Sequence, residues 1–412
     1  MFLVIAAKRY LSKYEITIFF FLGIQFLALA PRAEDMDILV AASYLFSYRY
    51  GISSRSLIAT ILDFFTRGGF VSRTLVWHFI AGATLLMAFS LSVFVSAAIR
   101  GLSRKPKIFA IFLAFLWLSC FTSPAVYFTK FNFGRFEVFA LVMLFVAAFA
   151  ADRPALRWVV PVIALAIVST HLNLVFFFMP FIGILLLYQA LKEKPGSAES
   201  RRAWLLLTVT VALALAAFAL YLALARRTFA FDDADAFYAH LLERTDLIFS
   251  RWAVHIAMFA DLEEHLALWR RTVVLTFRGH VSVVISLPIV ALFVVFWIKC
   301  FLREPEKRMR VFFIAPLAAL PYNAIAFFLF FDFGRWLTMS LAVQFMLAFY
   351  LLWRGNKTVL AVSNSGARMI RRHAFVIALA CLLMAFLGPV TQHMPSENAL
   401  NFFRLVRSFT GL

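Results

Sequence analysis

Long runs of apolar residues recur along the whole chain, and this pattern limits the possible folds more than any other feature. The runs are about 17–25 residues long, which is the length that an α-helix needs to cross a bilayer. Hydrophobic residues make up 64% of the 412 residues and charged residues 15%, so no segment is left to form a separate soluble domain. Helices satisfy their own backbone hydrogen bonds inside a bilayer. The sequence therefore predicts one all-α transmembrane domain over residues 1–412.

Hydropathy predicts about eleven spans, with boundaries that are soft by a few residues. The first apolar run has the length of a signal peptide, but Pro31-Arg32-Ala33-Glu34-Asp35 is not a small-residue cleavage site. We therefore expect a retained first span. The predicted spans are 16–30, 74–98, 108–128, 138–151, 158–170, 173–190, 204–225, 281–298, 311–331, 336–353 and 374–390.

Positive charge is concentrated in alternate connecting segments. With a cytoplasmic N-terminus, the inner segments hold 23 of the 40 Lys and Arg residues but only six of the 21 Asp and Glu residues. Short loops rich in Lys and Arg stay on the cytoplasmic side, so this distribution predicts the orientation. It also explains most of the net charge of +19, and nucleic-acid binding is not needed to account for it. The partner that this composition indicates is the lipid bilayer. The composition does not indicate an oligomeric state.

Two predicted outer loops are long, residues 31–73 and 226–280. The first contains a helical apolar stripe that we expect to be capped by Ser53 or Ser54 and stopped by Gly68-Gly69. Such a helix is expected to lie in the membrane interface. The second loop is rich in charged and aromatic residues and has Gly279 as its only Gly or Pro, so two or three helices are expected in it. The stripe in the first loop comprises Leu57, Ile61, Phe64 and Phe65.

A five-residue pattern occurs twice, 200 positions apart, and each copy opens an apolar run. The copies are Asn132-Phe133-Gly134-Arg135-Phe136 and Asp332-Phe333-Gly334-Arg335-Trp336. We expect Asn132 and Asp332 to cap two helices, with Arg135 and Arg335 in the first turns. A helix N-terminus and an Arg guanidinium both donate hydrogen bonds to phosphate, so two such ends on one side of the membrane would hold a diphosphate. The alternative is that each arginine only anchors its helix among lipid headgroups.

Further candidates lie close to the predicted outer surface. Asp35 and Asp37, just after the first span, could take a proton from a sugar hydroxyl, or they could cap the following helix. His171 interrupts an apolar stretch between two spans and would lie near the level of the two arginines; it could equally be an interface histidine bonded to a carbonyl.

No metal site or cofactor is expected from the sequence. The acidic segment 232–235 fits a helix cap better than a metal loop. Cys120, Cys300 and Cys381 fall in or at the ends of different spans, and they offer neither a disulfide framework nor a Cys-x-x-Cys site. We expect them to be buried as small hydrophobic side chains.

The order of these features resembles the EpsG/Wzy-type exopolysaccharide and O-antigen polymerases, within the wider GT-C glycosyltransferases. The resemblance rests on the acids after the first span, Gly134-Arg135, Asp152-Arg153-Pro154, the segment from Thr170 to Leu174, and Gly334-Arg335-Trp336. It covers most of the chain loosely. Those polymerases often have an Asp-Tyr-type motif where this chain has Asp35-Met36-Asp37-Ile38, which leaves open whether Asp35 or Asp37 corresponds to it.

The resemblance implies a GT-C-like enzyme of the bacterial inner membrane that acts on glycans carried by a polyprenyl diphosphate. Arg135 and Arg335 would then neutralise the diphosphate leaving group, Asp35 or Asp37 would act as the base, and His171 would orient or stabilise the reacting groups. Two alternatives stay open. A flippase for lipid-linked oligosaccharides, or another transporter, also needs a basic cavity and many spans. A membrane acyltransferase would use His171 as its base.

Overall fold

The structure is a computed structural model, and every regular element in its described residues is a helix. It describes residues 13–53, 55–120, 123–130, 132–224, 228–260, 263–264, 266–268, 270, 277–329 and 333–386. An isolated parallel β-bridge joins Val71 to Thr245. Asp332 lies outside the described residues, as do 261–262 and 271–276 of the second long loop.

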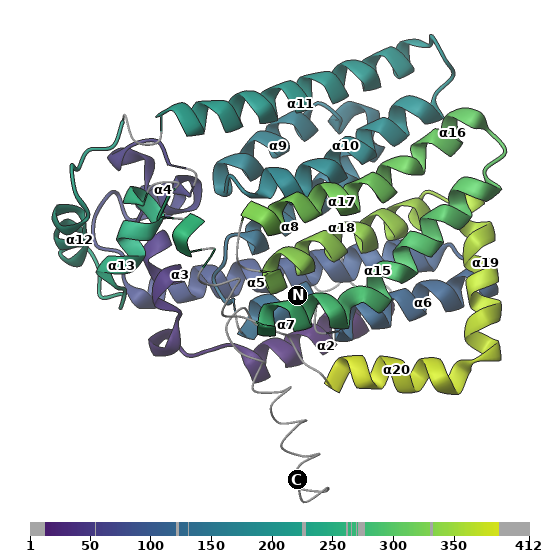
Figure 1. Cartoon of the computed structure of the whole chain (residues 1–412), viewed down its shortest axis with the longest axis horizontal. Coiled ribbons are helices and arrows are strands. Elements are labelled where there is room, and N and C mark those ends of the chain that lie inside the picture. The colour runs from purple at the N-terminus through teal and green to yellow at the C-terminus, as the bar shows by residue number, and fades with distance from the viewer. Residues whose placement is uncertain are drawn as a thin grey trace, which may run out of the picture.

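Twelve helices form a bundle in the described part of the chain, and they run roughly side by side in Figure 1. They are α2 (Lys13–Leu29), α5 (Arg73–Arg100), α6 (Arg104–Ser119), α7 (Pro124–Lys130), α8 (Glu137–Asp152), α9 (Val159–Thr170), α10 (Leu174–Lys192), α11 (Ala198–Leu224), α15 (Phe277–Arg303), α17 (Ile314–Leu329), α18 (Phe333–Trp353) and α20 (Ala374–Phe386). The connecting elements are η1 (Ala33–Asp35), α3 (Ile38–Ser43), η2 (Tyr48–Tyr50), α4 (Ser56–Phe65), η3 (Pro154–Leu156), α12 (Ala234–Leu242), α13 (Arg251–Val254), the π-helix η4 (His255–Phe259), α16 (Lys307–Phe312) and α19 (Lys357–Arg372).

Five helices of the described chain are long and apolar enough to cross a membrane. They span Arg73–Arg100, Leu174–Lys192, Ala198–Leu224, Ser286–Arg303 and Gly334–Trp353. These helices identify a membrane-spanning protein with several passes. The eleven predicted spans are not established, because α9 and α8 have only 12 and 16 residues, fewer than the ~20 of a typical span.

One predicted span, 108–128, is divided in the structure. The helix α6 ends at Ser119 and α7 begins at Pro124. Proline disfavours the helical conformation in the residue before it, so a continuous helix through Ser123 is not expected. Hydropathy averaged over a span-length window does not reveal such a short break.

The helix α18 forms the centre of the bundle. Of the residues in its apolar window, 94% are buried, and it packs against α5, α6, α10, α15 and α17. Trp117 of α6 stacks on Phe345, with ring centroids 5.3 Å apart. A helix that is apolar on all sides belongs in the interior of a bundle. Arg335, in the first turn of α18, is therefore buried too.

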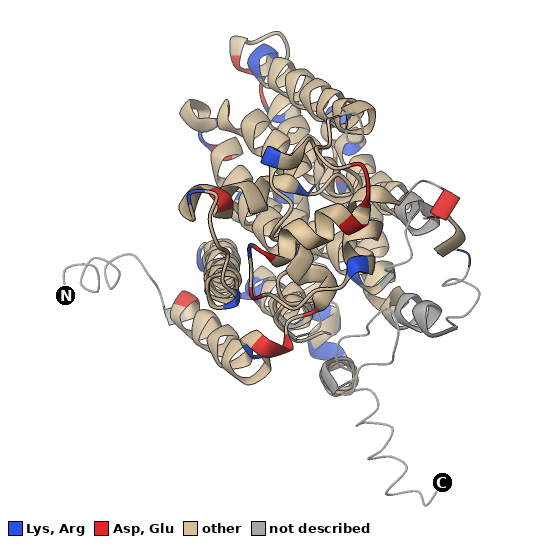
Figure 2. Ribbon diagram, turned by 90° about the vertical axis from the view of Figure 1, so that its left-hand side faces the viewer, with Lys and Arg blue, Asp and Glu red and all other residues tan. Residues whose placement is uncertain are grey.

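The two ends of the bundle differ. Elements α3, α4, α12 and α13 cover one end, at the left in Figure 1, which we call the loop end. Figure 2 looks onto this end, where acidic and basic residues both occur in the loops. At the opposite end α19 runs across the bundle (Figure 1). The sequence analysis placed residues 357–372 in a connecting segment; they form a helix because Val359, Val362 and Ala367 make a buried face opposite the exposed Arg368, Arg371 and Arg372.

The helix α4 corresponds to the stripe noted in residues 31–73. Its N-cap is Arg55 rather than Ser53, and Ser54 lies outside the described residues. Ile58 and Leu62 are buried, whereas Phe64 and Phe65 are exposed. The apolar stripe therefore faces outward, and a second apolar side of the same helix packs on the protein.

Candidate functional site

A small polar cavity lies at the loop end, where several segments distant in sequence meet. Its walls come from α3, the residue before α4, the turn before α8, the turn between α9 and α10, and the first turn of α18. About 10 Å³ of it is accessible to water, which is room for about one water molecule. The lining residues are Val40, Ser43, Arg55, Gly134, Arg135, Phe136, His171 and Arg335. Arg135, Arg335 and His171 thus share one cavity.

Arg135 is held by a tight turn rather than by a helix. The N–H of Arg135 donates to the Asn132 carbonyl at 3.1 Å, and Tyr44 donates from its hydroxyl to the Gly134 carbonyl at 2.6 Å. Gly134 has φ +89°, in the left-handed region that favours glycine. A Cβ there would lie 2.7 Å from Val40 Cγ1 and 2.8 Å from Ile80 Cδ1. Only glycine fits this turn without displacing its neighbours.

The expected capping role of Asn132 is wrong for this helix. The N-cap of α8 is Phe136, and α8 begins at Glu137, so Asn132 and Arg135 both precede the helix. The left-handed Gly134 ends any helical path before it reaches Arg135. In the second copy, Arg335 does lie in the first turn of α18, which begins at Phe333. The capping prediction for Asp332 falls on a residue outside the described chain.

Arg335 is fixed by a buried carboxylate and by aromatic rings. Its Nε donates to Glu137 Oε1 at 2.6 Å, and its Nη2 contacts the same oxygen. The side chain of Glu137 is 0% exposed and that of Arg335 6%. The Arg335 guanidinium carbon lies 4.3 Å from the Trp336 ring centroid, a cation–π distance. Phe177 in turn stacks on Trp336 with centroids 4.8 Å apart.

Glu137 is one of the site residues that the sequence reasoning missed. It directly follows the first copy of the repeat, and it pairs with the arginine of the second copy. An acidic residue at the start of an apolar run was the available signal, because a buried charge needs a partner. Its Oε2 atom has no hydrogen-bond partner among the described residues.

His171 directly follows α9, as its C-cap, and lies in the turn between α9 and α10. It is 4% exposed, and its Nδ1 accepts a hydrogen bond from the Asn173 N–H at 3.2 Å. Burial lowers the pKa of His171 well below its usual range, and the positive charges of Arg55, Arg335 and Arg135 lower it further. The imidazole is therefore neutral at pH 7, with its proton on Nε2.

Arg55 is a third arginine of the cavity, and the sequence did not point to it as a site residue. Burial lowers its pKa to about 10, and the charges of Arg335 and Arg135 act in the same direction. Glu137 opposes this effect. A guanidinium with a pKa of about 10 is still charged at neutral pH, so Arg55 adds a positive charge to the cavity.

Asp35 and Asp37 lie outside this cavity lining. Both are exposed. Asp35 ends η1, and Asp37 is the N-cap of α3, where its Oδ1 accepts from the N–H groups of Leu39 at 2.8 Å and Val40 at 3.0 Å. The carboxylate of Asp37 therefore has a structural task. Asp233 caps α12 in the same way, accepting from the N–H groups of Asp235 and Ala236.

The cavity is suited to an anion. Three guanidiniums meet there, and Arg135 Nε is buried with no hydrogen-bond acceptor in the described part of the chain. Buried charges of one sign are stabilised by a ligand of the other sign. In its present form the cavity holds about one water molecule, so a phosphate group can enter only if one of the walls moves.

No family model matches the chain, and no curated protein and no solved structure shows significant similarity to it.

Proposed function

We propose that the protein is a membrane glycosyltransferase or polymerase that acts on glycans carried by a polyprenyl diphosphate. The observation that supports this most is the meeting of Arg55, Arg135 and Arg335 in one buried cavity at the loop end. Arg guanidiniums bind phosphate with two parallel hydrogen bonds. A buried phosphate site in a membrane-spanning protein favours a lipid-linked phosphate over a soluble one.

In this proposal the loop end faces the outside of a bacterial inner membrane. The shorter apolar helices would cross the membrane as well, giving about eleven spans in a GT-C-like arrangement. This count includes helices shorter than the usual ~20 residues, which would cross while packed within the bundle. Cysteine replacements at the exposed Arg67 and Asp235 should then react with an impermeant reagent added from the periplasmic side.

Each residue has a proposed task. Arg135 and Arg335 bind the two phosphates and stabilise the charge of the departing diphosphate. The neutral His171 donates from Nε2 to an oxygen of the reacting group. The base that takes the proton from the acceptor hydroxyl is Asp35 or Asp37, and since both lie outside the cavity lining, the acceptor would enter from the exposed side.

The first test is binding of farnesyl diphosphate to the full chain in nanodiscs. Arg135→Lys and Arg335→Lys keep the charge but lose the planar fork. We expect each to weaken binding, and to lower glycan transfer roughly 10²–10³-fold if the lost donor acts in the transition state. Arg354→Lys is the matched control, because Arg354 pairs with Asp152 at 2.6 Å beyond the far end of α18.

The outcomes separate the candidate functions. If both arginine variants bind farnesyl diphosphate as the wild type does, the arginines only anchor their helices and the proposal is wrong. If binding depends on them but no glycan is transferred in cells that make the native lipid-linked glycan, a transporter of the same lipid is favoured.

A further inference from the structure

Arg55 differs from the other cavity arginines in the element that carries it. Arg135 lies in the turn before the bundle helix α8 and Arg335 lies in the first turn of α18, whereas Arg55 precedes α4 in the first loop. We call residues 55–68 the α4 arm. The cavity has room for about one water molecule, so a phosphate needs a wall that can move. Two walls lie outside the bundle, α3 and the α4 arm, and of these two the arm carries an arginine.

The C-terminal end of the α4 arm has backbone angles that are typical of a hinge, which we call the joint. Arg67 and Gly68 have φ +52° and +71°, and Gly69 follows. Before the arm, Gly51 has φ +133°. Left-handed residues mark sharp changes in chain direction, and glycines there allow the backbone angles to change at low cost. The arm is thus bounded by glycines on both sides.

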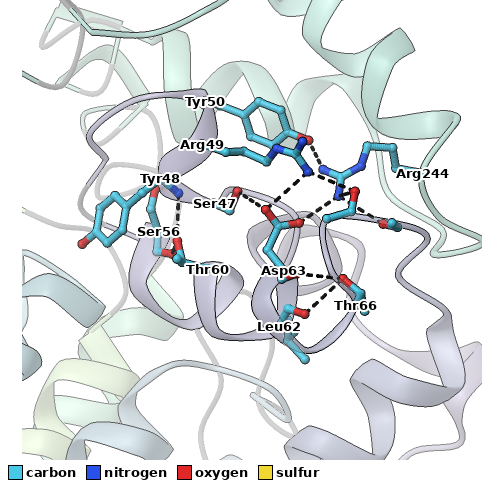
Figure 3. A network of polar contacts seen from close by, with 12 residues as sticks. Ser47, Tyr48, Arg49, Tyr50, Ser56, Thr60, Leu62, Asp63, Thr66 and Arg244 are labelled. Atoms are coloured by element: carbon cyan, nitrogen blue, oxygen red, sulfur yellow. Dashed lines mark hydrogen bonds and ion pairs between the residues drawn. The ribbon is translucent and has the colours of Figure 1, made fainter.

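One side chain from the second loop holds both the arm and its joint (Figure 3). Arg244 Nη2 donates to Asp63 Oδ1 at 2.8 Å, to the Gly68 carbonyl at 2.9 Å and to the Gly69 carbonyl at 3.1 Å. Asp63 also accepts from the Ser47 hydroxyl at 2.9 Å. The Asp63 and Arg244 side chains are only 16% and 13% exposed, so water weakens this pair less than a surface pair.

The backbone of the second loop around Arg244, which we call the platform, is held by hydrogen bonds that do not involve Asp63. The Val71 N–H donates to the Arg244 carbonyl at 2.8 Å, and the Arg73 N–H donates to Asp246 Oδ1 at 2.5 Å. The Arg244 backbone therefore stays in place if Asp63 is altered. The arm, in contrast, is joined to this platform by side-chain contacts.

We propose that Arg55 is a third phosphate-binding residue, carried on an arm that opens to admit the ligand, and that the Asp63–Arg244 pair holds this arm closed. The inference rests on the proposed function, because it takes a lipid-linked phosphate as the ligand of the cavity. In the closed position Arg55 adds its donors to those of Arg135 and Arg335. In the open position it withdraws, and the phosphate can enter or leave.

The proposal predicts different rate effects for two substitutions. Arg55→Gln removes a charged donor, so it should weaken binding roughly 10- to 100-fold, through faster dissociation. Asp63→Asn weakens the contact between residue 63 and Arg244, and so the attachment of the arm, both in the free and in the ligand-bound protein. It should therefore speed both association and dissociation, with a smaller change in the dissociation constant. A pair that only stabilises the fold would not speed association.

The experiment uses stopped-flow binding of inorganic diphosphate to the full chain in nanodiscs. Trp336, next to Arg335, supplies a fluorescence signal, and hydrogen exchange of residues 56–66 reports on the arm. Asp63→Asn should increase this exchange, diphosphate should decrease it in the wild type, and Asp63→Glu should restore wild-type rates. Asp235→Asn is the matched control, since Asp235 forms an exposed ion pair with Arg251 in the same loop.

The outcomes distinguish this inference from the proposed function. If Arg135→Lys weakens diphosphate binding while Arg55→Gln and Asp63→Asn leave rates and exchange unchanged, the arm is a fixed wall and the inference is overturned, but the phosphate site stands. If the wild type binds no diphosphate, both are overturned.

Discussion

Glu137 and Arg335 stand 198 positions apart in the chain and form a fully buried ion pair, with Arg335 Nε 2.6 Å from Glu137 Oε1. Glu137 directly follows the first copy of the repeated pattern, and Arg335 belongs to the second. The pair therefore ties the start of α8 to the start of α18, and it fixes one of the three cavity arginines.

We expect Glu137→Ala to destabilise the protein strongly. Removing one partner of a buried ion pair leaves the other charge unpaired, at a cost of about 3–5 kcal/mol. Thermal unfolding in nanodiscs measures the effect. The double variant Glu137→Leu with Arg335→Leu should recover part of the loss, because an apolar pair leaves no unpaired charge. A double variant less stable than Glu137→Ala would contradict this explanation.

Gly134→Ala should also destabilise the protein, for two separable reasons. Gly134 has φ +89°, and its added Cβ would collide with Val40 and Ile80. Gly196→Ala provides the control, because Gly196 has φ +77° with nothing within 4 Å of its Cβ position. In both variants the backbone strain should lower the free energy of unfolding by about 1–2 kcal/mol. In Gly134→Ala, overpacking should lower it by a further ~1–3 kcal/mol. Equal losses in unfolding experiments would mean that the neighbours of Gly134 adapt freely.

The two candidate bases should respond differently to substitution. Asp37 caps α3, and Asn caps a helix as well as Asp does, whereas Ala costs about 1 kcal/mol. We therefore expect Asp37→Asn to keep both stability and activity, and Asp37→Ala to lose stability. Asp35→Asn is then the variant expected to abolish glycan transfer without changing the unfolding temperature. If Asp37→Asn is stable and inactive instead, Asp37 is the base.

His171 should make the protein less stable under mildly acidic conditions. The folded state lowers the pKa of His171 below its usual value, so the unfolded chain binds the proton more readily. The stability from this group is complete above pH ~6.5 and falls below it by up to about 1.4 kcal/mol per pH unit. Unfolding measured between pH 8 and 5 should show this slope in the wild type and not in His171→Gln. Parallel curves for the two proteins would exclude the effect.

The class of the protein was predictable from sequence because its cause is local. Each apolar run must satisfy its own backbone in a bilayer, so length and hydropathy alone indicate a helical membrane protein, whether or not each run crosses it. The break between Ser119 and Pro124 was missed, because hydropathy does not register the conformational restriction that a proline places on the residue before it.

The candidate site was predictable only in part. The sequence determined that Arg135 and Arg335 begin apolar segments and that His171 interrupts one. It also predicted that both arginines lie in the first turn of a helix. In the structure, the left-handed Gly134 places Arg135 in a turn, whereas Arg335 lies in the helix α18. That difference depends on Tyr44, Val40 and Ile80, which contact or crowd Gly134 from other elements.

The tertiary structure alone decided which charges meet. Glu137 reaches Arg335 because the ends of α8 and α18 lie together in the bundle, and Arg55 reaches the cavity because the first loop folds over that end. A helix is specified by residues three and four positions apart, whereas the three arginines that meet at this cavity are 80 to 280 positions apart. The sequence by itself thus determined a multi-pass helical membrane protein with two unusual arginines, and only the packing of the bundle brought a third arginine and a buried carboxylate to them.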